Sequence, residues 1–251
     1  MASNFPVTSS RNPSFFWNFR REDSGHDRVA GMFARGLLAI LAASVFSSCA
    51  VLERRAEEKR LAVARAEALA AHSTWRSGSG WKSKTYRNEA VLSNATPENC
   101  RVEIALSEQR GLLLVDGQIA MDFPVATGKR SHPTPPGEYT VMGKQKDYSS
   151  NLYGKIVDAA GTVLVSDADT TRDVPPEGAV FEGAKMPYWM RLTNSGVGMH
   201  VGYVPGRPAS HGCIRLKRET AVFLFGLLKI GTPVVVADHV PALEDDGSEA
   251  R

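Results

Sequence analysis

Cysteine is scarce in this chain, and its three residues, Cys49, Cys100 and Cys213, form no CxxC pair. Closely paired cysteines mark zinc fingers and thioredoxin-like redox sites, so both classes are excluded. An odd number also leaves at least one thiol outside any intramolecular disulfide. The surroundings of each cysteine therefore indicate what it does.

The chain also lacks a strong excess of either charge. Its 30 basic and 27 acidic residues are mixed along the sequence and give a formal net charge of +3. Nucleic-acid-binding domains carry a basic patch, and those that bind single strands place aromatic residues within it. No such patch is present, so we expect no nucleic-acid partner. Residues 128–131 (GKRS) lack the upstream glycine of a phosphate loop, and no nucleotide site is indicated.

The apolar run 36–46 is shorter than the roughly 20 residues that span a bilayer as a helix. Arg35 precedes it, and small residues lead from it to Cys49, which is the charged, apolar, small order of a secretory signal. The ending FSSC resembles a bacterial lipobox, whose cysteine is lipidated. We expect residues 1–49 to be a lipoprotein-type leader, with Met32 as a candidate start. An uncleaved signal anchor or an ordinary signal is the alternative.

Residues 50–73 are rich in Ala, Glu, Arg and Leu and contain no Gly or Pro, which predicts a helical spacer. The charges and the thin apolar stripe favour a solvated helix over a coiled coil. Residues 74–97 bring Ser, Gly, Lys and Asn, and we expect a flexible linker there. At the other end of the chain, residues 239–251 are predicted to form a polar tail.

Residues 98–238 change to short alternating segments bounded by Gly, Pro and Asp, such as CRVEIALS and the pair around Asp116-Gly117. One helix candidate, KRETAVFLFGLLK, comes late, before a last apolar strand. This order predicts one mostly β domain, a β-sandwich or small barrel, with one late helix. Cys100 opens the first strand and is expected to be a small buried apolar residue. A bond from it to Cys213 is the alternative.

The segment GVGMHVGYVPGRPASHGCIRL, residues 196–216, places a thiol close to two histidines. A cysteine nucleophile reacts as the thiolate and needs a base to take its proton. His200 ends an apolar strand, and the following loop can return the chain to bring Cys213 within its reach; His211 lies two residues before the thiol. On residue types alone, a buried structural cysteine or a zinc site made by His200, His211 and Cys213 remains open.

This segment resembles the L,D-transpeptidases of the YkuD type, whose signature is a histidine, a short loop and [S/T]HGC followed by a hydrophobic residue and Arg or Asn. The resemblance extends upstream to SEQRGLLLVDGQIAMDFPVATGKRSHPTPPGEYTV, to DYSSNLYG and to MPYWMRLTNSGVGMH. It covers roughly residues 98–237 and implies a YkuD-like fold for the domain at 98–238.

The resemblance implies a role for each matching residue. Cys213 would be the nucleophile, and His200 its general base and later acid, oriented by the main-chain carbonyl of Val201. Gly212, together with Cys213 itself, would offer N–H groups to an oxyanion. Where many members have Gly or Ser after the histidine, this chain has Val201.

Three further residues of the motif are assigned to the pocket. Ser210 and His211 would shape it, with a structural role favoured for both. Arg215 would hold a substrate carboxylate or order the loop, because a guanidinium offers a planar fork of donors.

The resemblance also implies the reaction and its partners. The thiol would attack a peptidoglycan tetrapeptide stem at its third residue, expel D-alanine, and pass the acyl group to an amine of another stem or of a lipoprotein lysine. No metal or cofactor is required. The alternatives are a hydrolase of stems or of murein-bound lipoprotein on the same scaffold, and a non-catalytic lipid-anchored murein-binding module. We expect the protein on the periplasmic side of the cell envelope, anchored by lipid and favouring the outer membrane.

If Cys49 carries the lipid anchor, Cys49→Ser should end the incorporation of a labelled fatty acid and release the protein from membranes, since the thiol is the site of lipidation. Fractionation of cells that express the wild type and the variant measures both effects. Wild-type protein found free of membranes and without lipid would reject the anchor.

Overall fold

The structure, a computed structural model, describes residues 26–240 and 242, with side chains from residue 51 onward. The predicted leader therefore lies outside the described side chains, Cys49 included, and residues 1–25 lie outside the described chain. Among the described residues, no helix has both the length and the apolarity needed to cross a bilayer.

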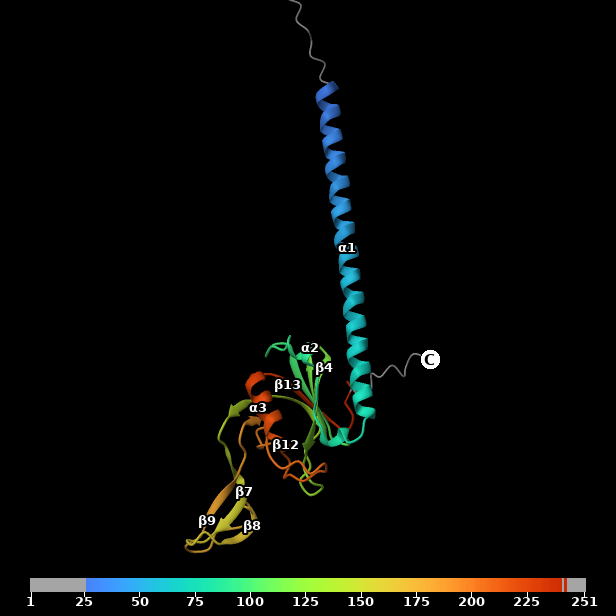
Figure 1. Ribbon diagram of the computed structural model, residues 1–251. Coiled ribbons are helices and arrows are strands. Elements are labelled where there is room, and N and C mark those ends of the chain that lie inside the picture. The colour runs from blue at the N-terminus through green and yellow to red at the C-terminus, as the bar shows by residue number, and fades with distance from the viewer. Residues whose placement is uncertain (1–25, 241, 243–251) are drawn as a thin grey trace, which may run out of the picture. The chain divides into compact units, whose positions relative to one another are not determined.

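Helices and strands make up most of the described chain (Figure 1). In chain order they are α1 (His26–Ser77), the 3₁₀ turn η1 (Trp81–Ser83), β1 (Tyr86–Arg87), α2 (Glu89–Leu92), β2 (Cys100–Ala105), β3 (Arg110–Val115), β4 (Gln118–Ala126), β5 (Gly137–Thr140), β6 (Gly143–Gln145), β7 (Ser149–Val157), β8 (Val163–Asp169), β9 (Val180–Lys185), β10 (Trp189–Arg191), β11 (Gly198–Val201), β12 (Ile214–Leu216), α3 (Arg218–Leu227) and β13 (Pro233–Ala237).

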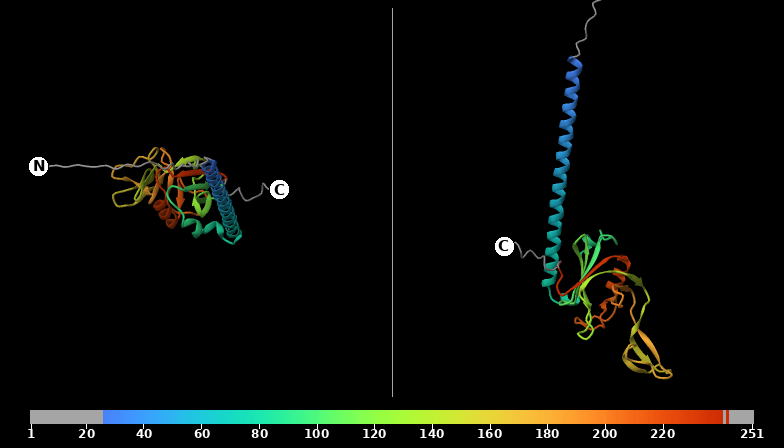
Figure 2. Two further views of the ribbon diagram at one scale, coloured as in Figure 1. Left: turned by 90° about the horizontal axis from the view of Figure 1, so that it is seen from above. Right: turned by 180° about the vertical axis from the view of Figure 1, so that it is seen from behind.

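Ten strands form one curled sheet in the order β5-β13-β2-β3-β4-β12-β11-β10-β6, with β1 added beside β4. Two of its pairs are parallel, β13 with β2 and β11 with β12. The curl is visible from the front and from behind (Figures 1 and 2). The prediction of a mostly β domain with one late helix is confirmed, and ten of its strands belong to this curled sheet.

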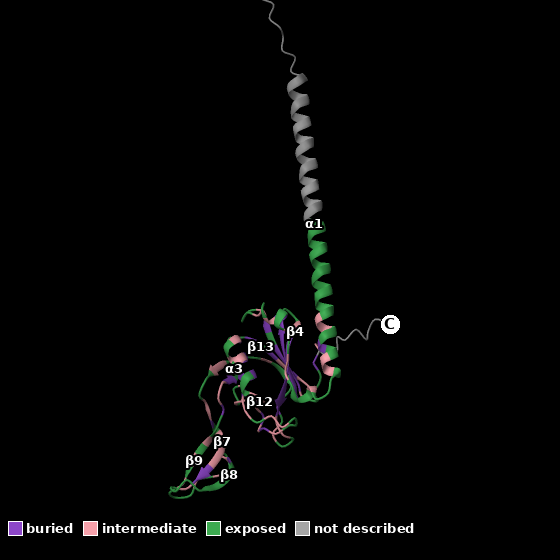
Figure 3. Cartoon of the chain, viewed as in Figure 1, coloured by how far each residue is buried: buried purple, intermediate pink, exposed green. Residues whose placement is uncertain are grey.

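The core lies inside this curl. Strands β3 and β4 are almost entirely buried, and α3 adds Ala221 and Leu224, which have no exposed surface. Figure 3 shows the buried residues gathered on the central strands. Cys100, at the start of β2, belongs to this core and carries a free thiol, as expected.

Strands β8, β7 and β9 form a separate three-stranded sheet in that order. It projects from the ten-stranded sheet, and β8 and β9 are mostly exposed (Figures 1 and 3). Its base continues the pairing of β6 with β10, because Met186 and Tyr188 donate backbone hydrogen bonds to the carbonyls of Tyr148 and Lys146.

Residues 74–97 differ from the predicted flexible linker. Helix α1 continues to Ser77, and β1 pairs with β4. Asn88 caps the N-terminus of α2, and its side chain accepts a hydrogen bond from the Val91 N–H. The Trp75 ring contacts the rings of Trp81 and Tyr86. Partial burial of these rings and burial of Val91 offset the entropy lost on ordering a segment of polar composition.

The helical spacer predicted for residues 50–73 lies within α1, and its residues 51–67 are exposed. In the predicted polar tail, Val240 is fully buried against the outer face of the sheet, so the tail does not begin at residue 239.

A buried carboxylate holds the end of α1 on the ten-stranded sheet. Asp122 of β4 and Arg110 of β3 have no exposed surface, and Arg110 Nε donates to Asp122 Oδ1 at 2.6 Å. His72 Nε2 and Arg76 Nε each lie 2.8 Å from Asp122 Oδ2. Burial alone would raise the pKa of Asp122, but the hydrogen bond from His72 and the charges of Arg110 and Arg76 hold it below its ordinary value.

Asp122→Ala should lower the free energy of unfolding by about 3–5 kcal/mol, because it leaves the Arg110 guanidinium buried without its counter-charge. Glu108→Gln is the matched control: Glu108 also pairs with Arg76, at 2.9 Å, but its side chain is 35% exposed. Its loss should cost less than about 1 kcal/mol. Denaturant unfolding of both variants measures the difference, and equal costs would contradict this account.

Candidate active site

The parallel pair of β11 and β12 places the predicted histidine and cysteine together. His200 is opposite Arg215 in the register, and Met199 is opposite Ile214. Cys213 is the residue just before β12, so the loop 202–213 brings the thiol back beside the strand that carries His200. The return loop expected from the sequence is therefore present.

The loop that carries the thiol is fixed by hydrogen bonds on both sides. Ser210 Oγ donates to the Cys213 carbonyl and accepts from the Gly212 N–H at 3.1 Å. Thr134 Oγ1 donates to the Gly212 carbonyl and accepts from the Gly128 N–H, each at 2.8 Å. Ser210 is 1% exposed. Its position matches the structural role favoured for it.

Gly212 adopts φ 106°, in the region that an L side chain rarely enters. The turn expected between His211 and Cys213 therefore depends on glycine at this position. Because the Gly212 N–H already donates to Ser210, it is not placed to stabilise an oxyanion in this structure. Of the two donors expected for that role, the N–H of Cys213 is the one left to consider.

The tautomer of His200 follows from its partner. Its Nδ1 lies 2.8 Å from the Val201 carbonyl oxygen, which can only accept, so Nδ1 carries the proton. The second ring nitrogen, Nε2, is then an unprotonated acceptor when the imidazole is neutral. The carbonyl predicted to orient this histidine is its observed partner.

Burial sets the protonation of both groups. His200 is 6% exposed and packs near the Trp189 ring, at 5.9 Å between centroids. Burial, together with the Arg215 charge, lowers the pKa of His200 to about 4, although the bond to Val201 opposes this. Burial also raises the pKa of the Cys213 thiol. Both groups are therefore neutral at pH 7, and the thiol donates to the Gly196 carbonyl, with a sulfur–oxygen distance of 3.6 Å.

Arg215 presents a charge without a fixed partner. Among the described side chains, none forms a hydrogen bond or an ion pair with its guanidinium. Its aliphatic stem lies on Gly202, where an added Cβ would come within 2.8 Å of Arg215 Cγ. The glycine thus leaves room for the arginine, whose head is available to an anion.

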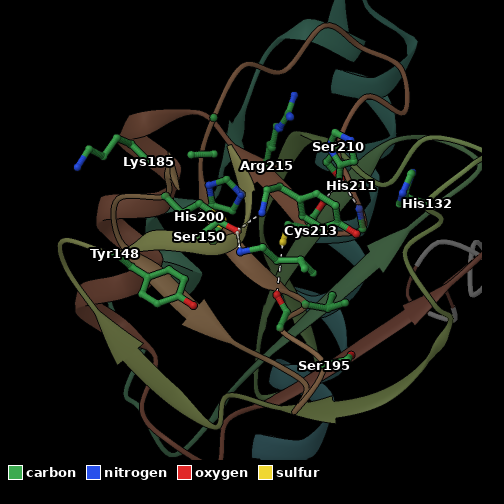
Figure 4. Close-up of a pocket in the computed structure, with 18 of the residues that line it drawn as sticks. His132, Tyr148, Ser150, Lys185, Ser195, His200, Ser210, His211, Cys213 and Arg215 are labelled. Carbon is green, nitrogen blue, oxygen red and sulfur yellow. Dashed lines mark hydrogen bonds between the residues drawn. The ribbon is translucent and has the colours of Figure 1, made fainter. Parts of the chain in front are cut away.

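These residues line one cavity of about 520 Å³ (Figure 4). Cys213 lies in the figure between His200 on one side and His211 and Ser210 on the other. Lys185 and Arg215 are the cationic residues of the described lining other than histidine, and no described Asp or Glu lines it. The cavity is therefore suited to a neutral or anionic molecule.

His211 faces a different set of partners. Its Nε2 lies 2.9 Å from Lys129 Nζ and 3.2 Å from Asp167 Oδ1, and its ring stacks on Tyr153 at 4.5 Å. His211 therefore belongs to the wall of the cavity, as expected of a pocket residue. Lys129, Asp167, Tyr153 and Thr134 were not predicted as site residues. Lys129, Thr134 and Tyr153 lie in the upstream segments that carry the family resemblance, but none of them was singled out there.

The residue types left a disulfide and a zinc site open as alternatives. Cys100 and Cys213 both carry free thiols, so no disulfide joins them. Within the described residues, no group of three or more His, Cys, Asp or Glu side chains is arranged to hold a metal ion.

A thiol and a neutral imidazole thus line one cavity of a curled β domain. The family model for the YkuD L,D-transpeptidase catalytic domain matches residues 100–236, more than half of the 251-residue chain. The chain therefore belongs to this family, as the motif predicted.

Curated relatives match over part of their length. "Probable L,D-transpeptidase 3" of Mycobacterium tuberculosis is 30% identical over 122 residues, which is 46% of this chain and 38% of that protein. "L,D-transpeptidase 1" of the same species is 27% identical over 129 residues, 48% of this chain and 43% of that protein. This chain thus spans about two fifths of their length.

Solved structures match less closely. An L,D-transpeptidase from Mycobacterium smegmatis has 22% identity and a TM-score of 0.44, over 55% of this chain and 58% of that one.

Because the resting thiol is neutral, alkylation of Cys213 by iodoacetamide should accelerate continuously between about pH 6 and pH 9, as the thiolate fraction grows. Because burial raises the pKa of the Cys213 thiol, the alkylation rate should level off at a higher pH than it does for an ordinary cysteine. Mass spectrometry of the modified peptide follows the rate, with buried Cys100 as an internal control. A plateau that begins below about pH 6 would indicate a thiolate–imidazolium pair and contradict this assignment.

Proposed function

We propose that this chain is a peptidoglycan L,D-transpeptidase in which Cys213 is the nucleophile and His200 the general base. The observation that carries the proposal is the hydrogen bond from His200 Nδ1 to the Val201 carbonyl. It leaves Nε2 free to accept a proton, in the cavity that also holds the Cys213 thiol. Membership of the family supports the choice of reaction.

The first half of the reaction makes a thioester. His200 Nε2 takes the thiol proton as Cys213 sulfur attacks the carbonyl of the third residue of a tetrapeptide stem. The negative charge develops on the former carbonyl oxygen, near the N–H of Cys213. When the carbon–nitrogen bond breaks, the protonated His200 returns the proton to the amine of the departing D-alanine.

The second half transfers the acyl group. An amine of another stem attacks the thioester carbonyl, His200 takes a proton from that amine, and the Cys213 thiolate leaves and is reprotonated. A lipoprotein lysine presents the same amine chemistry. The low pKa of His200, about 4, keeps the base unprotonated at neutral pH, so each cycle starts from the form that can accept a proton.

The charge of the cavity supports a donor that carries carboxylates. D-alanine at the end of the stem places a carboxylate one residue from the bond that breaks. Arg215 lines the cavity with a guanidinium that has no partner among the described side chains, and the described lining contains no acid. A carboxylate bound there would gain a charge-assisted pair without displacing an existing one.

We also propose that the chain acts in the cell envelope on the periplasmic side, held by lipid on Cys49. The support for this part is the order of charged, apolar and small residues before Cys49.

Purified protein incubated with tetrapeptide muropeptides should yield cross-linked products and free D-alanine, measured by mass spectrometry. Cys213→Ser and His200→Ala should each lower the rate by at least about 100-fold, the scale of a lost nucleophile or base. Covalent labelling by a carbapenem should fail in the same variants. Tripeptide as the sole product would indicate hydrolysis, and full activity of His200→Ala at neutral pH would reject its role.

Arg215→Lys should lower kcat/KM for tetrapeptide donors by about tenfold, because lysine keeps the charge but loses the bidentate fork. A carbapenem depends less on contacts with the stem, so its acylation rate should fall less. The two rates, measured on the same variant, show whether Arg215 binds the donor or supports the loop of Cys213. Equal losses would leave Arg215 as a residue that braces the loop.

A further inference from the structure

Five side chains connect the three-stranded sheet with the loops around the thiol. Tyr153 on β7 and Asp167 on β8 come from that sheet. Lys129 and His132 come from the loop after β4, and His211 comes from the loop that ends at Cys213. The small sheet, the loop after β4 and the loop before β12 are separated from one another in the sequence, so these side chains meet only in the folded chain.

Three of these residues form a closed triangle of polar contacts. Lys129 Nζ lies 2.9 Å from His211 Nε2, and Asp167 Oδ1 lies 3.2 Å from the same nitrogen. The other carboxylate oxygen, Asp167 Oδ2, lies 3.4 Å from Lys129 Nζ. We call Lys129, Asp167 and His211 the clamp.

The hydrogen-bonding capacity of His211 Nε2 explains why the clamp contains both Lys129 and Asp167. A neutral His211 either accepts at Nε2 from Lys129 or donates from Nε2 to Asp167, and it cannot do both at once. In either tautomer, the contact between Lys129 and Asp167 remains. The clamp therefore joins the sheet to the loop whichever nitrogen of His211 carries the proton.

Ring contacts support the same junction. The Tyr153 ring stacks on His211 with 4.5 Å between centroids, and His132 meets both rings edge-on at 4.8 and 5.8 Å. His211 lies two residues before Cys213, and Tyr153, His132 and His211 all line the cavity of the thiol. A change in the clamp thus alters the wall that a donor stem would contact.

We propose that Lys129 and Asp167 are positioning residues which, through His211, hold the three-stranded sheet against the loop of Cys213 and so shape the donor cavity. This inference rests on the proposed function of that cavity. The clamp touches no reacting atom, and its effect is on how well a stem binds.

The exposure of the clamp suits a contact that opens and closes. The side chains of Lys129 and Asp167 are 36% and 66% exposed, and ion pairs of this kind are weak and screened by salt. A polymeric donor must enter the cavity before the sheet can close on it, and a weak clamp permits both states.

The test compares donor kinetics in Lys129→Met, Asp167→Ala and the double variant with the wild type. KM for a tetrapeptide donor should rise about fivefold in each single variant, with kcat within about twofold. In the double variant the effect on KM should be smaller than the product of the two single effects, because the contact between Lys129 and Asp167 is lost in either single variant. Lys129→Arg should recover most of the lost affinity.

Glu182→Gln is the matched control. Glu182 lies on β9 of the same small sheet, but its partner at 2.8 Å is Lys155 of β7, within that sheet. It removes one acidic charge without breaking a contact to the loop of the thiol, so the donor KM should stay at the wild-type value.

Carbapenem acylation of Cys213, measured on every variant, distinguishes a failure of the clamp from a failure of the proposed function. The clamp would be overturned if Lys129→Met and Asp167→Ala are still acylated by a carbapenem and have the wild-type KM for the donor. Equal losses of donor affinity and carbapenem acylation, with a lowered Tm, would also overturn it, because they indicate general destabilisation. A wild type that no carbapenem acylates and that turns over no stem would reject the proposed function, and the clamp with it.

Discussion

The site depends on the parallel pairing of β11 with β12. This pairing sets His200 opposite Arg215 and places Cys213 at the end of the returning loop, just before β12. Side chains alternate between the faces of a strand, so a slip of one residue would turn His200 away from the cavity. The buried neighbours Met199 and Ile214, with no exposed surface, fix the register because a slip would move them out of the core. The packing of the core thereby determines where Cys213 and His200 lie relative to each other.

The same burial makes the resting pair unreactive. Burial lowers the pKa of His200 to about 4 and raises the pKa of the Cys213 thiol, so the neutral pair is strongly favoured over a thiolate–imidazolium pair. A neutral thiol reacts more slowly with oxidants and alkylating reagents than a thiolate does. In the proposed reaction, the thiol becomes reactive only when a donor is bound, because attack on the donor carbonyl accompanies the proton transfer to His200. Specificity and activation are coupled in this arrangement.

The sequence predicted the parts of the site that lie close together along the chain. His200, Ser210 and Cys213 fall within one short motif, and alternation identified β2, β11 and β13. Lys129 and Asp167 carried no local signal, because their meeting with His211 depends on how two sheets come together. The prediction for residues 74–97 was wrong for a similar reason: the segment is polar in composition, and its order comes from contacts of Trp75 and its neighbours with distant strands.

The two sheets differ in how firmly they are held, and this difference assigns them different tasks. The ten-stranded sheet has a buried core and the Asp122–Arg110 pair, so the loop of Cys213 is attached to a rigid base. The three-stranded sheet has mostly exposed strands and reaches that loop through weak polar contacts and the Tyr153 ring. Local stability follows buried contact, so movement during a reaction cycle is expected in the smaller sheet. Cys213 and His200 can then stay in place while the wall of the cavity opposite them moves.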